Sequence, residues 1–405
     1  MSANATGDQP SQLNLVDRTF RANPGYRLTL FDRLPLEQQQ ALAGLREDPD
    51  LYGLLIAHNG SLRSKSVSQQ TALLFLSLQH PGRLPFYVLD HAAADLEESI
   101  ARLVTDGVLE VQVGDGFISG ALAHGLLFPS PTGEEELGFL GRLSLEAIRY
   151  GACLDGLGTA ELSRRLYLYN RIPVSGRWRS RIGSSDDLKQ HWGIPRGIES
   201  LPGGNRWRLI DTRMDDWICW RQSGVTGRAH ERQATYKLYV SPKPDQVAGS
   251  LAATVKVLIN AGAPSLKIGG TLTGLLRPDK IVCYFDSFDQ MSEAASELAP
   301  KLEGVAAQGV PFTSELAGEG LISWGVDPAS NEEAFGWLGR QSWRLWVTNH
   351  LAASLLAAGS GSVPAWRFAL DRLSLEGVDP STWAPRDLSR LASAADESQG
   401  VGAWR

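Results

Sequence analysis

The chain has 405 residues, of which 43% are hydrophobic and 21% charged, as is typical of a globular protein with room for two or three domains. Its formal net charge of −6 argues against a nonspecific nucleic-acid-binding protein, so nucleic acid is not an expected partner. No apolar run reaches transmembrane length, and residues 1–12 lack the apolar core of a secretory signal, so we expect a cytoplasmic protein without a membrane partner.

The motifs of common cofactor and metal sites are missing from the sequence. The three cysteines, at positions 153, 219 and 283, show no CxxC spacing, and no two of the seven histidines have a metal-ligand spacing. There is no glycine-rich phosphate-binding loop and no serine-hydrolase elbow. We therefore expect reduced thiols and an activity that needs neither a metal nor an organic cofactor.

Residues 1–17 are predicted to be a mobile polar tail, and residues 18–192 a mostly helical region. In chain order, the patterns predict a helix at 31–43, a strand at 51–57, helices at 66–78 and 95–106, and a hairpin of 108–113 with 117–119. Helix, helix and hairpin in this order are typical of a winged-helix module, at about residues 50–130.

The charge of this module decides between its possible partners. Residues 51–130 contain four Lys or Arg against seven Asp or Glu, which is a local net charge of −3. A winged helix that reads DNA normally has a basic recognition helix. A peptide-binding, protein-binding or purely structural module is therefore favoured over a DNA-binding regulator.

The densest basic stretch lies in residues 137–192, which are predicted to be helical with breaks near Gly156 and Pro173. No acidic residue interrupts its arginines, which are Arg164, Arg165, Arg171, Arg177, Arg179 and Arg181. All of these except Arg171 are candidates for contact with an acidic peptide or a partner protein, because guanidinium groups bind carboxylates and phosphates. The alternative is a solvated helix face whose arginines pair with acidic neighbours in the same chain.

Residues 194–204 are rich in Gly and Pro and are predicted to link the helical region to a second domain at 205–395, with a tail at 396–405. The predicted strands of this domain are 207–211, 216–221, 234–241, 265–269, 280–286 and 321–326, and its predicted helices are 244–261, 289–306, 331–358 and pieces of 366–395. This order predicts an α+β fold in which helices flank a mixed or antiparallel sheet.

Two of the predicted strands each present one lysine. Alternation in residues 234–241 places Lys237 and Tyr239 on one face and apolar residues on the other, and Lys267 lies between apolar neighbours in residues 265–269. A strand–helix–strand unit brings the two lysines together, so each is expected to lower the pKa of the other and to hold an anion or remove a proton. The alternative is that both protect sheet edges against aggregation.

A phosphate is the expected guest of the two lysines, because its negative charge offsets their repulsion. Arg277, with Arg228 or Arg232, would complete such an anion pocket. One lysine would remove the Cα proton of a phosphorylated residue, and Tyr239 or His230 would protonate the leaving phosphate. For His230, an ordinary surface histidine is the alternative.

Residues 236–328 resemble the HopA family of bacterial type III effectors and, more distantly, the phosphothreonine lyases of pathogen effectors. The resemblance lies in the runs Tyr236–Ser241 and Ser265–Gly269, followed by Arg277 and the predicted strand Ile281–Phe285. It covers less than a third of the chain.

The resemblance implies roles for individual residues. Lys237 and Arg277 would bind phosphate, Lys267 would be the general base, and Tyr284 would line the site. The position of the histidine acid in those lyases holds Tyr239 in this chain. Either nearby cations lower the pKa of Tyr239 and make it a better acid, or the acid lies elsewhere, or the site does not catalyse.

Proteins similar to the HopA family also occur beside small kinases in gene clusters that make lanthionine- and thioamide-type peptides. The resemblance therefore implies a lyase that eliminates phosphate from phosphoserine or phosphothreonine of a phosphorylated precursor peptide, giving dehydroalanine or dehydrobutyrine. Its setting would be the biosynthesis of ribosomally made, modified peptides (RiPPs) such as lanthipeptides, with a partner kinase. The rival hypothesis is a non-catalytic scaffold that binds a leader peptide or phosphopeptide and delivers it to the kinase.

Overall fold

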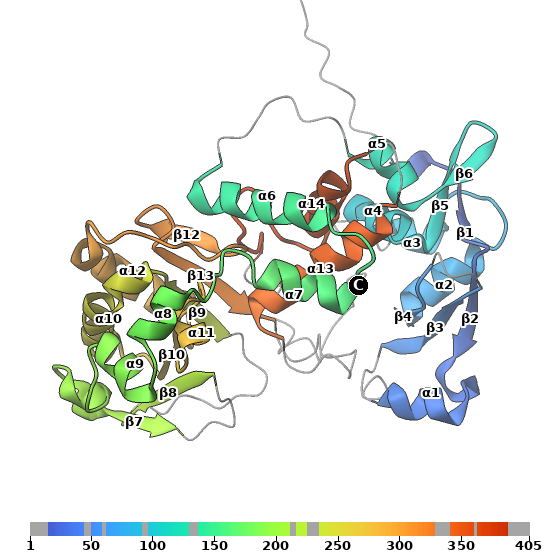
Figure 1. Ribbon diagram of the computed structural model, residues 1–405. Helices are drawn as coiled ribbons and strands as arrows, with labels where there is room; N and C mark the ends of the chain where they lie inside the picture. The colour runs from blue at the N-terminus through green and yellow to red at the C-terminus, as the bar shows by residue number, and fades with distance from the viewer. Residues whose placement is uncertain are drawn as a thin grey trace, which may run out of the picture.

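The computed structural model describes residues 15–43, 50–58, 62–90, 96–128, 137–210, 216–224, 235–328, 341–359 and 363–387. The fold is α+β, as the sequence predicted. Figure 1 shows a sheet-containing body on each side and a group of helices between them. These bridging helices are α6 (Phe139–Ala152), α7 (Thr159–Tyr167), α13 (Trp343–Ala357) and α14 (Ala365–Leu375). In the described part of the chain, no helix is both long and apolar enough to cross a membrane.

The N-terminal body contains two small antiparallel sheets, of order β1-β5-β6 and β2-β3-β4, with helices packed beside them. Its elements are β1 (Phe20–Ala22), β2 (Tyr26–Leu30), α1 (Leu36–Ala41), β3 (Leu51–Ala57), β4 (Lys65–Ser68), α2 (Gln69–Ser77), α3 (Phe86–Asp90), α4 (Leu96–Thr105), β5 (Leu109–Val113), β6 (Gly116–Ile118) and α5 (His124–Leu127). Phe20, Leu74 and Ile100 are buried together in its core. The winged-helix interpretation of this body stays a prediction.

The C-terminal body is built on a seven-stranded sheet of order β12-β13-β9-β11-β10-β8-β7, in which every pairing is antiparallel. Its strands are β7 (Trp207–Ile210), β8 (Trp217–Gln222), β9 (Thr235–Val240), β10 (Ser265–Gly269), β11 (Ile281–Phe285), β12 (Ser314–Ala317) and β13 (Ile322–Asp327). Its helices are α8 (Gly176–Arg181), α9 (Ser185–His191), α10 (Val247–Ala261), α11 (Leu272–Leu275) and α12 (Phe288–Leu298).

One face of this sheet is apolar and carries the core. Leu238, Leu266 and Cys283 point to that face and are buried with side chains of α10 and α12. The same core includes Ala147 of α6 and Trp192, which follows α9. One apolar core therefore extends from the bridging helices into the sheet, and the domain boundary expected between residues 192 and 205 stays a prediction.

Two predicted helices are shorter in the structure because of prolines. Pro35 has no N–H and holds Leu34 in an extended conformation, so only the second half of the predicted helix at 31–43 is α-helical. The predicted helix at 289–306 ends at residue 298 and continues as a 3-10 turn that contains Pro300. A proline cannot donate the next hydrogen bond of an α-helix.

Two other helices begin later than predicted, each at a serine cap. Residues 65–68 pair with β3 as a strand, and the Ser68 hydroxyl then accepts a hydrogen bond from the first turn of α2. In the predicted helix at 331–358, Ser342 caps α13 in the same way, so the helix starts at residue 343. Residues 331–340 of the predicted helix lie outside the described residues.

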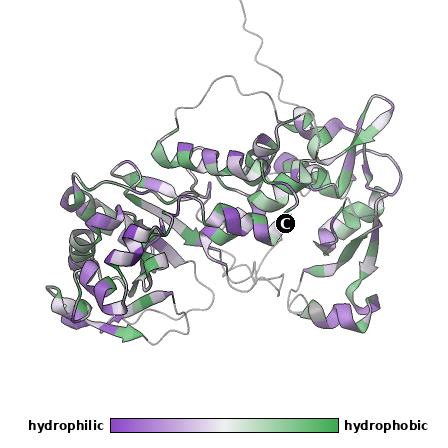
Figure 2. Ribbon diagram, in the orientation of Figure 1, coloured by the Kyte–Doolittle hydropathy of each residue, from purple (hydrophilic) through white to green (hydrophobic). Residues whose placement is uncertain are grey.

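The bridging helices are amphipathic, with hydrophilic and hydrophobic residues alternating along α6 and α7 (Figure 2). On α7, Leu162 and Leu166 are buried in the core, whereas Arg164 and Arg165 are exposed. A helix with this spacing buries one side and leaves the other to solvent. Tyr167, the last residue of α7, reaches the polar face of the large sheet, where its hydroxyl donates to Asp279.

Candidate functional site

The second face of the large sheet is polar, and it holds both lysines. Lys237 and Tyr239 alternate with the apolar residues of β9, as predicted. Across the antiparallel ladder, Tyr284 of β11 lies opposite Lys237, and Val282 lies opposite both Tyr239 and Lys267 of β10. Because opposite residues in a ladder point to the same face, the register places Lys237 and Lys267 on one side of the sheet.

The aromatic ring of Tyr284 lies close to both ammonium groups. The Nζ atom of Lys237 lies 5.4 Å from the centre of the ring and that of Lys267 lies 5.5 Å from it, so the two nitrogens are at most 10.9 Å apart. The Nζ atom of Lys267 also lies 4.3 Å from the ring centre of Trp217 on β8. Two cations and two aromatic rings therefore gather at one point of the polar face.

Lys237 is buried and forms an ion pair with Asp327 at the end of β13. The second carboxylate oxygen of Asp327 accepts a hydrogen bond of 2.9 Å from the backbone N–H of Trp343, the first residue of α13. The charge of Lys237 is thus compensated by a carboxylate that the start of a helix holds in place.

Arg277 reaches the same face from the segment between α11 and β11. Its guanidinium donates to both oxygens of Asp279, at 2.8 and 2.9 Å, and to the hydroxyl of Tyr167 at 3.3 Å. The centre of its guanidinium lies 4.7 Å from the ring centre of Trp217, which is also in contact with Lys267. The phosphate-binding arginine predicted from the sequence therefore converges on the lysine site.

Asp279 lies between two arginines. Arg344, in the first turn of α13, is only 1% exposed and donates to Asp279 at 2.8 Å. Arg344 also donates to the carbonyl oxygens of Tyr167 and Pro311. Burial raises the pKa of the Asp279 carboxyl, but Arg344 and Arg277 outweigh this effect and hold the pKa well below its usual range.

The same surroundings lower the pKa of Lys267. Burial and the nearby charge of Lys237 lower the pKa of Lys267 to about 8. Among the described residues, its ammonium has no hydrogen-bond or ion-pair partner. Lys267 is therefore the group of this cluster that can be neutral near physiological pH and accept a proton.

A third lysine, Lys280, has its pKa lowered to about 7 by burial, yet it does not belong to this site. Its side chain is completely buried, and its ammonium donates to the carbonyl of Pro242 and to the side chain of Gln308. A base that is fixed to two internal acceptors cannot reach a substrate. Lys280 holds neighbouring loops together.

The six ionised groups of the cluster do not balance. Among the described residues, Lys237, Lys267, Arg277 and Arg344 face two carboxylates, those of Asp279 and Asp327. This leaves an excess of two positive charges, or of one when Lys267 is neutral. Within the described ranges, one terminal nitrogen of Arg277 and the whole ammonium of Lys267 have no acceptor, so the cluster can bind an anion through charge-assisted hydrogen bonds.

Tyr239 differs from the expectation. Burial and the charge of Asp327 raise its pKa well above 10, so the predicted lowering by nearby cations is wrong. The ring is 3% exposed and packs against Val282 and Val310. The sequence could not show that the carboxylate of Asp327, far along the chain, acts on this phenol. Three further candidates, Arg228, Arg232 and His230, lie outside the described residues.

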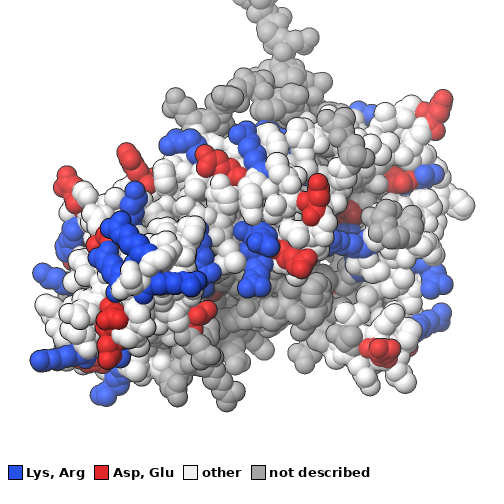
Figure 3. Space-filling model, in the orientation of Figure 1, with Lys and Arg blue, Asp and Glu red and all other residues white. Residues whose placement is uncertain are grey.

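The arginine run is partly paired within the chain. Arg181 forms an ion pair with Asp245, as the alternative hypothesis expected, and it lies over the ring of Trp178. The remaining four predicted contact residues are exposed; they are Arg164, Arg165, Arg177 and Arg179. Figure 3 shows the blue side chains gathered over α7 and α8 on one face of the molecule.

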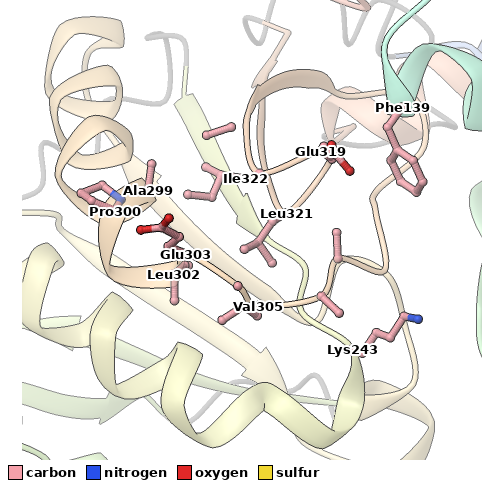
Figure 4. Close-up of a pocket in the computed structure, with 15 residues that line it drawn as sticks. Phe139, Lys243, Ala299, Pro300, Leu302, Glu303, Val305, Glu319, Leu321 and Ile322 are labelled. Atoms are coloured by element: carbon pink, nitrogen blue, oxygen red, sulfur yellow. The ribbon is translucent and has the colours of Figure 1, made fainter.

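A hollow in the C-terminal body lies away from these charges. A cavity of about 640 Å³ is lined by the 3-10 turn Ala299–Leu302, the turn between β12 and β13, Phe139 and Lys243 (Figure 4). Its ionisable residues are Lys243, Glu303 and Glu319, and none of the lysine–arginine cluster lines it. The candidate site is therefore the cluster, where buried charges surround Lys267, a lysine of lowered pKa.

Among the described residues, no group of three or more His, Cys, Asp or Glu could hold a metal ion. The sequence matches no protein-family model and no curated protein.

Solved structures that are similar to the chain include two effector proteins and a phosphothreonine lyase. An effector protein from Pseudomonas syringae pv. syringae strain 61 shares 11% identity over 60% of this chain and 98% of its own, with a TM-score of 0.37. An effector protein from Pseudomonas syringae pv. tomato strain DC3000 shares 11% identity over 61% and 98%, with a TM-score of 0.38. The type III effector and phosphothreonine lyase OspF from Shigella flexneri shares 14% identity over 46% and 94%, with a TM-score of 0.28. These TM-scores are too low to establish a common fold.

Proposed function

We propose that the protein is a lyase that eliminates phosphate from phosphoserine or phosphothreonine in a peptide, leaving dehydroalanine or dehydrobutyrine. The observation that supports this function best is the pairing of Lys267, whose pKa is lowered to about 8, with a group of cations that has an excess of positive charge. β-Elimination of phosphate requires a base that removes the Cα proton and, beside it, groups that bind the phosphate.

The reaction balances with the residues of the cluster. Neutral Lys267 takes the Cα proton, and the electrons of the C–H bond form the Cα=Cβ double bond. The Cβ–O bond breaks, and its electron pair leaves with the phosphate, which Lys237 and Arg277 hold. The leaving phosphate takes up one proton, and solvent later restores the protonation states of the two lysines.

In this proposal Lys237, rather than Tyr239, donates the proton to the leaving phosphate. The pKa of Tyr239 is raised well above 10, which makes the phenol a poor acid near neutral pH. Lys237 pairs with Asp327 and lies against the ring of Tyr284, which it shares with Lys267. Tyr239 and Tyr284 shape the site and neither give nor take a proton.

The proposed setting is the cytoplasmic biosynthesis of a modified peptide of the RiPP class, such as a lanthipeptide. A partner kinase would phosphorylate Ser or Thr of the precursor peptide, and this chain would remove the phosphate by elimination. The support for this setting is the sequence resemblance to the HopA family and to phosphothreonine lyases. The elimination chemistry is supported separately, by the site.

A second candidate function is a scaffold that binds a phosphopeptide or leader peptide without catalysis. The observation that favours it is the buried tyrosine at position 239, where the resembled lyases have a histidine acid. Such a scaffold would use the same cations to bind phosphate, but it would break no bond at Cα.

Isotope labelling at Cα separates the two functions. We expect the full chain to convert a phosphothreonine peptide to inorganic phosphate and a dehydrobutyrine peptide, with loss of a Cα deuteron from a labelled substrate. The release rate should be slower for the Cα-deuterated peptide, because the C–H bond breaks in the reaction. Bound peptide that keeps its phosphate and its deuteron would overturn the lyase in favour of the scaffold. A product with a free hydroxyl and a retained deuteron would show hydrolysis instead.

Phosphate recognition gives a test that does not depend on turnover. Removing Lys237 or Arg277 eliminates charge-assisted hydrogen bonds worth about 1.5–3 kcal/mol each. Lys237→Ala and Arg277→Ala should therefore weaken binding of a phosphopeptide by about 10- to 150-fold and leave the unphosphorylated peptide nearly unaffected. Fluorescence anisotropy with the two peptides measures both affinities. Equal losses for both peptides would place these residues outside the phosphate site.

A further inference from the structure

Arg171 connects the lysine–arginine cluster to the exposed arginines of α7. It lies four residues after the end of α7, and its terminal nitrogen donates to the carbonyl of Thr273 at 2.8 Å. The next residue, Ile172, donates from its backbone N–H to the carbonyl of Leu276, beside Arg277. The segment that carries Arg171 therefore lies against the segment that carries the phosphate-binding arginine.

The side chain of Arg171 has a donor without an acceptor. Its Nε atom is buried and makes no hydrogen bond within the described part of the chain. An N–H group in this state costs free energy that an incoming acceptor would recover. A carboxylate or phosphate oxygen is the kind of acceptor that would satisfy this donor.

Charged groups of both signs lie near Arg171. Burial lowers the pKa of Arg171, and the charges of Arg277 and Arg164 lower it further, while Asp216 and Asp279 act against them. Asp279 is already held by Arg277 and Arg344. One carboxylate, that of Asp216, is left to offset this group of cations.

Arg164 continues the row on the surface. It is exposed on α7, three residues before Tyr167, whose hydroxyl donates to Asp279 in the site. Residues three apart lie on the same side of a helix. Arg171 and Arg164 therefore form a strip that leads from Arg277, in the candidate phosphate site, to the exposed side of α7.

We infer that this strip, Arg171 with Arg164, binds acidic side chains of the peptide whose phosphorylated residue occupies the lysine site. An extended peptide advances about 3.3 Å per residue, so side chains a few positions from the phosphorylated residue reach such a strip. Carboxylates match the fork of a guanidinium and relieve the repulsion between neighbouring arginines. The inference rests on the proposed function, because it places the phosphorylated residue of the same peptide in the site.

The test compares two phosphothreonine peptides of equal length, one with Asp and Glu around the phosphorylated residue and one with Ser and Gly. We expect the wild-type protein to favour the acidic peptide in kcat/KM by about 2- to 30-fold, as two partly exposed ion pairs provide. The preference should shrink at high salt. In the double variant Arg164→Ser with Arg171→Ser, the ratio of the two kcat/KM values should fall toward one. Arg164→Ser alone removes only an exposed side chain, so the ratio should fall by a smaller amount.

Arg27→Ser is the matched control, because Arg27 is exposed on β2 in the other body and the change removes the same charge. Its preference should equal that of the wild type. An absent preference in the wild type, or a preference that survives the double variant, would overturn the inference while elimination itself stands.

If no peptide is turned over, the proposed lyase fails, and the strip is tested by binding of the unphosphorylated acidic peptide. Weaker binding by the double variant than by Arg27→Ser would support the strip, and equal binding would overturn it. A single-stranded oligonucleotide serves as the competing polyanion. If it binds as tightly as the acidic peptide and loses the same affinity in the double variant, the strip is a general polyanion site and the inference is wrong.

Discussion

Lys267→Ala is expected to abolish phosphate elimination while phosphopeptide binding stays nearly intact. A positioned general base contributes about 10²–10⁴-fold to a rate, so at least this much activity should be lost. Lys267→Arg should fail as well, because a guanidinium does not lose its proton near neutral pH. Single-turnover phosphate release measures the rate, and anisotropy measures peptide binding. Undiminished elimination by either variant would exclude Lys267 as the base.

Lys256→Ala is the control for this experiment. Lys256 is exposed on α10, the helix that packs on the opposite, apolar face of the sheet, so its removal deletes one charge without touching the site. It should retain the wild-type rate. A similar loss in both variants would indicate a general effect of net charge on the protein.

The pH dependence of the wild type gives a second measure of the same base. The reaction uses neutral Lys267, whose fraction rises with pH, and burial and Lys237 lower the pKa of Lys267 to about 8. The kcat/KM profile, which reports the free protein, should therefore rise with pH and level off above about 8. In kcat the midpoint should move to higher pH, because a bound phosphate dianion stabilises the ammonium form. A flat profile between pH 6 and about 9 would contradict the assignment.

The strands that carry the site could be predicted from the sequence because strand periodicity is local. Lys237 and Tyr239 share a face of β9 by simple alternation, and the run at 265–269 matches β10 at both ends. The convergence of Lys237, Lys267 and Tyr284 then follows from an antiparallel register that joins β9, β11 and β10.

The partners of these residues could not be predicted, since they come from distant parts of the chain. Asp279 lies 112 residues from Tyr167 and 65 residues from Arg344, and no local pattern links the three. Asp327 is equally remote from Lys237. Only Asp279 gives a signal, because it follows Arg277 by two residues and an Arg-Pro-Asp turn lets the two side chains meet. The pKa of Tyr239 differs from the prediction for the same reason. The sequence shows Lys237 two residues away but does not show the carboxylate of Asp327.

Asp279→Ala is expected to destabilise the folded protein by about 3–5 kcal/mol, the cost of breaking a buried ion pair from one side. Arg344 is only 1% exposed, and without Asp279 its guanidinium keeps two carbonyl acceptors but no counterion. Arg277 is nearer to solvent and would lose less. Urea unfolding followed by tryptophan fluorescence measures the change. Asp279→Asn, which keeps a hydrogen-bond acceptor without the charge, should lie between the wild type and the alanine variant.

The matched control is Asp245→Ala, which removes a carboxylate from the ion pair with Arg181. That pair is exposed on both sides, so its loss should change stability by less than about 1 kcal/mol.

The pH dependence distinguishes the two sites further. Because the pKa of Asp279 is depressed in the folded state, its contribution is complete above about pH 4, the unfolded value, and is lost as the pH falls below it. The wild type should therefore lose its advantage over Asp279→Ala in acid. If the alanine variants at 279 and 245 cost the same at neutral pH, Asp279 does not neutralise a buried arginine, and Arg277 would have to be held in the site by Trp217 and Tyr167 alone.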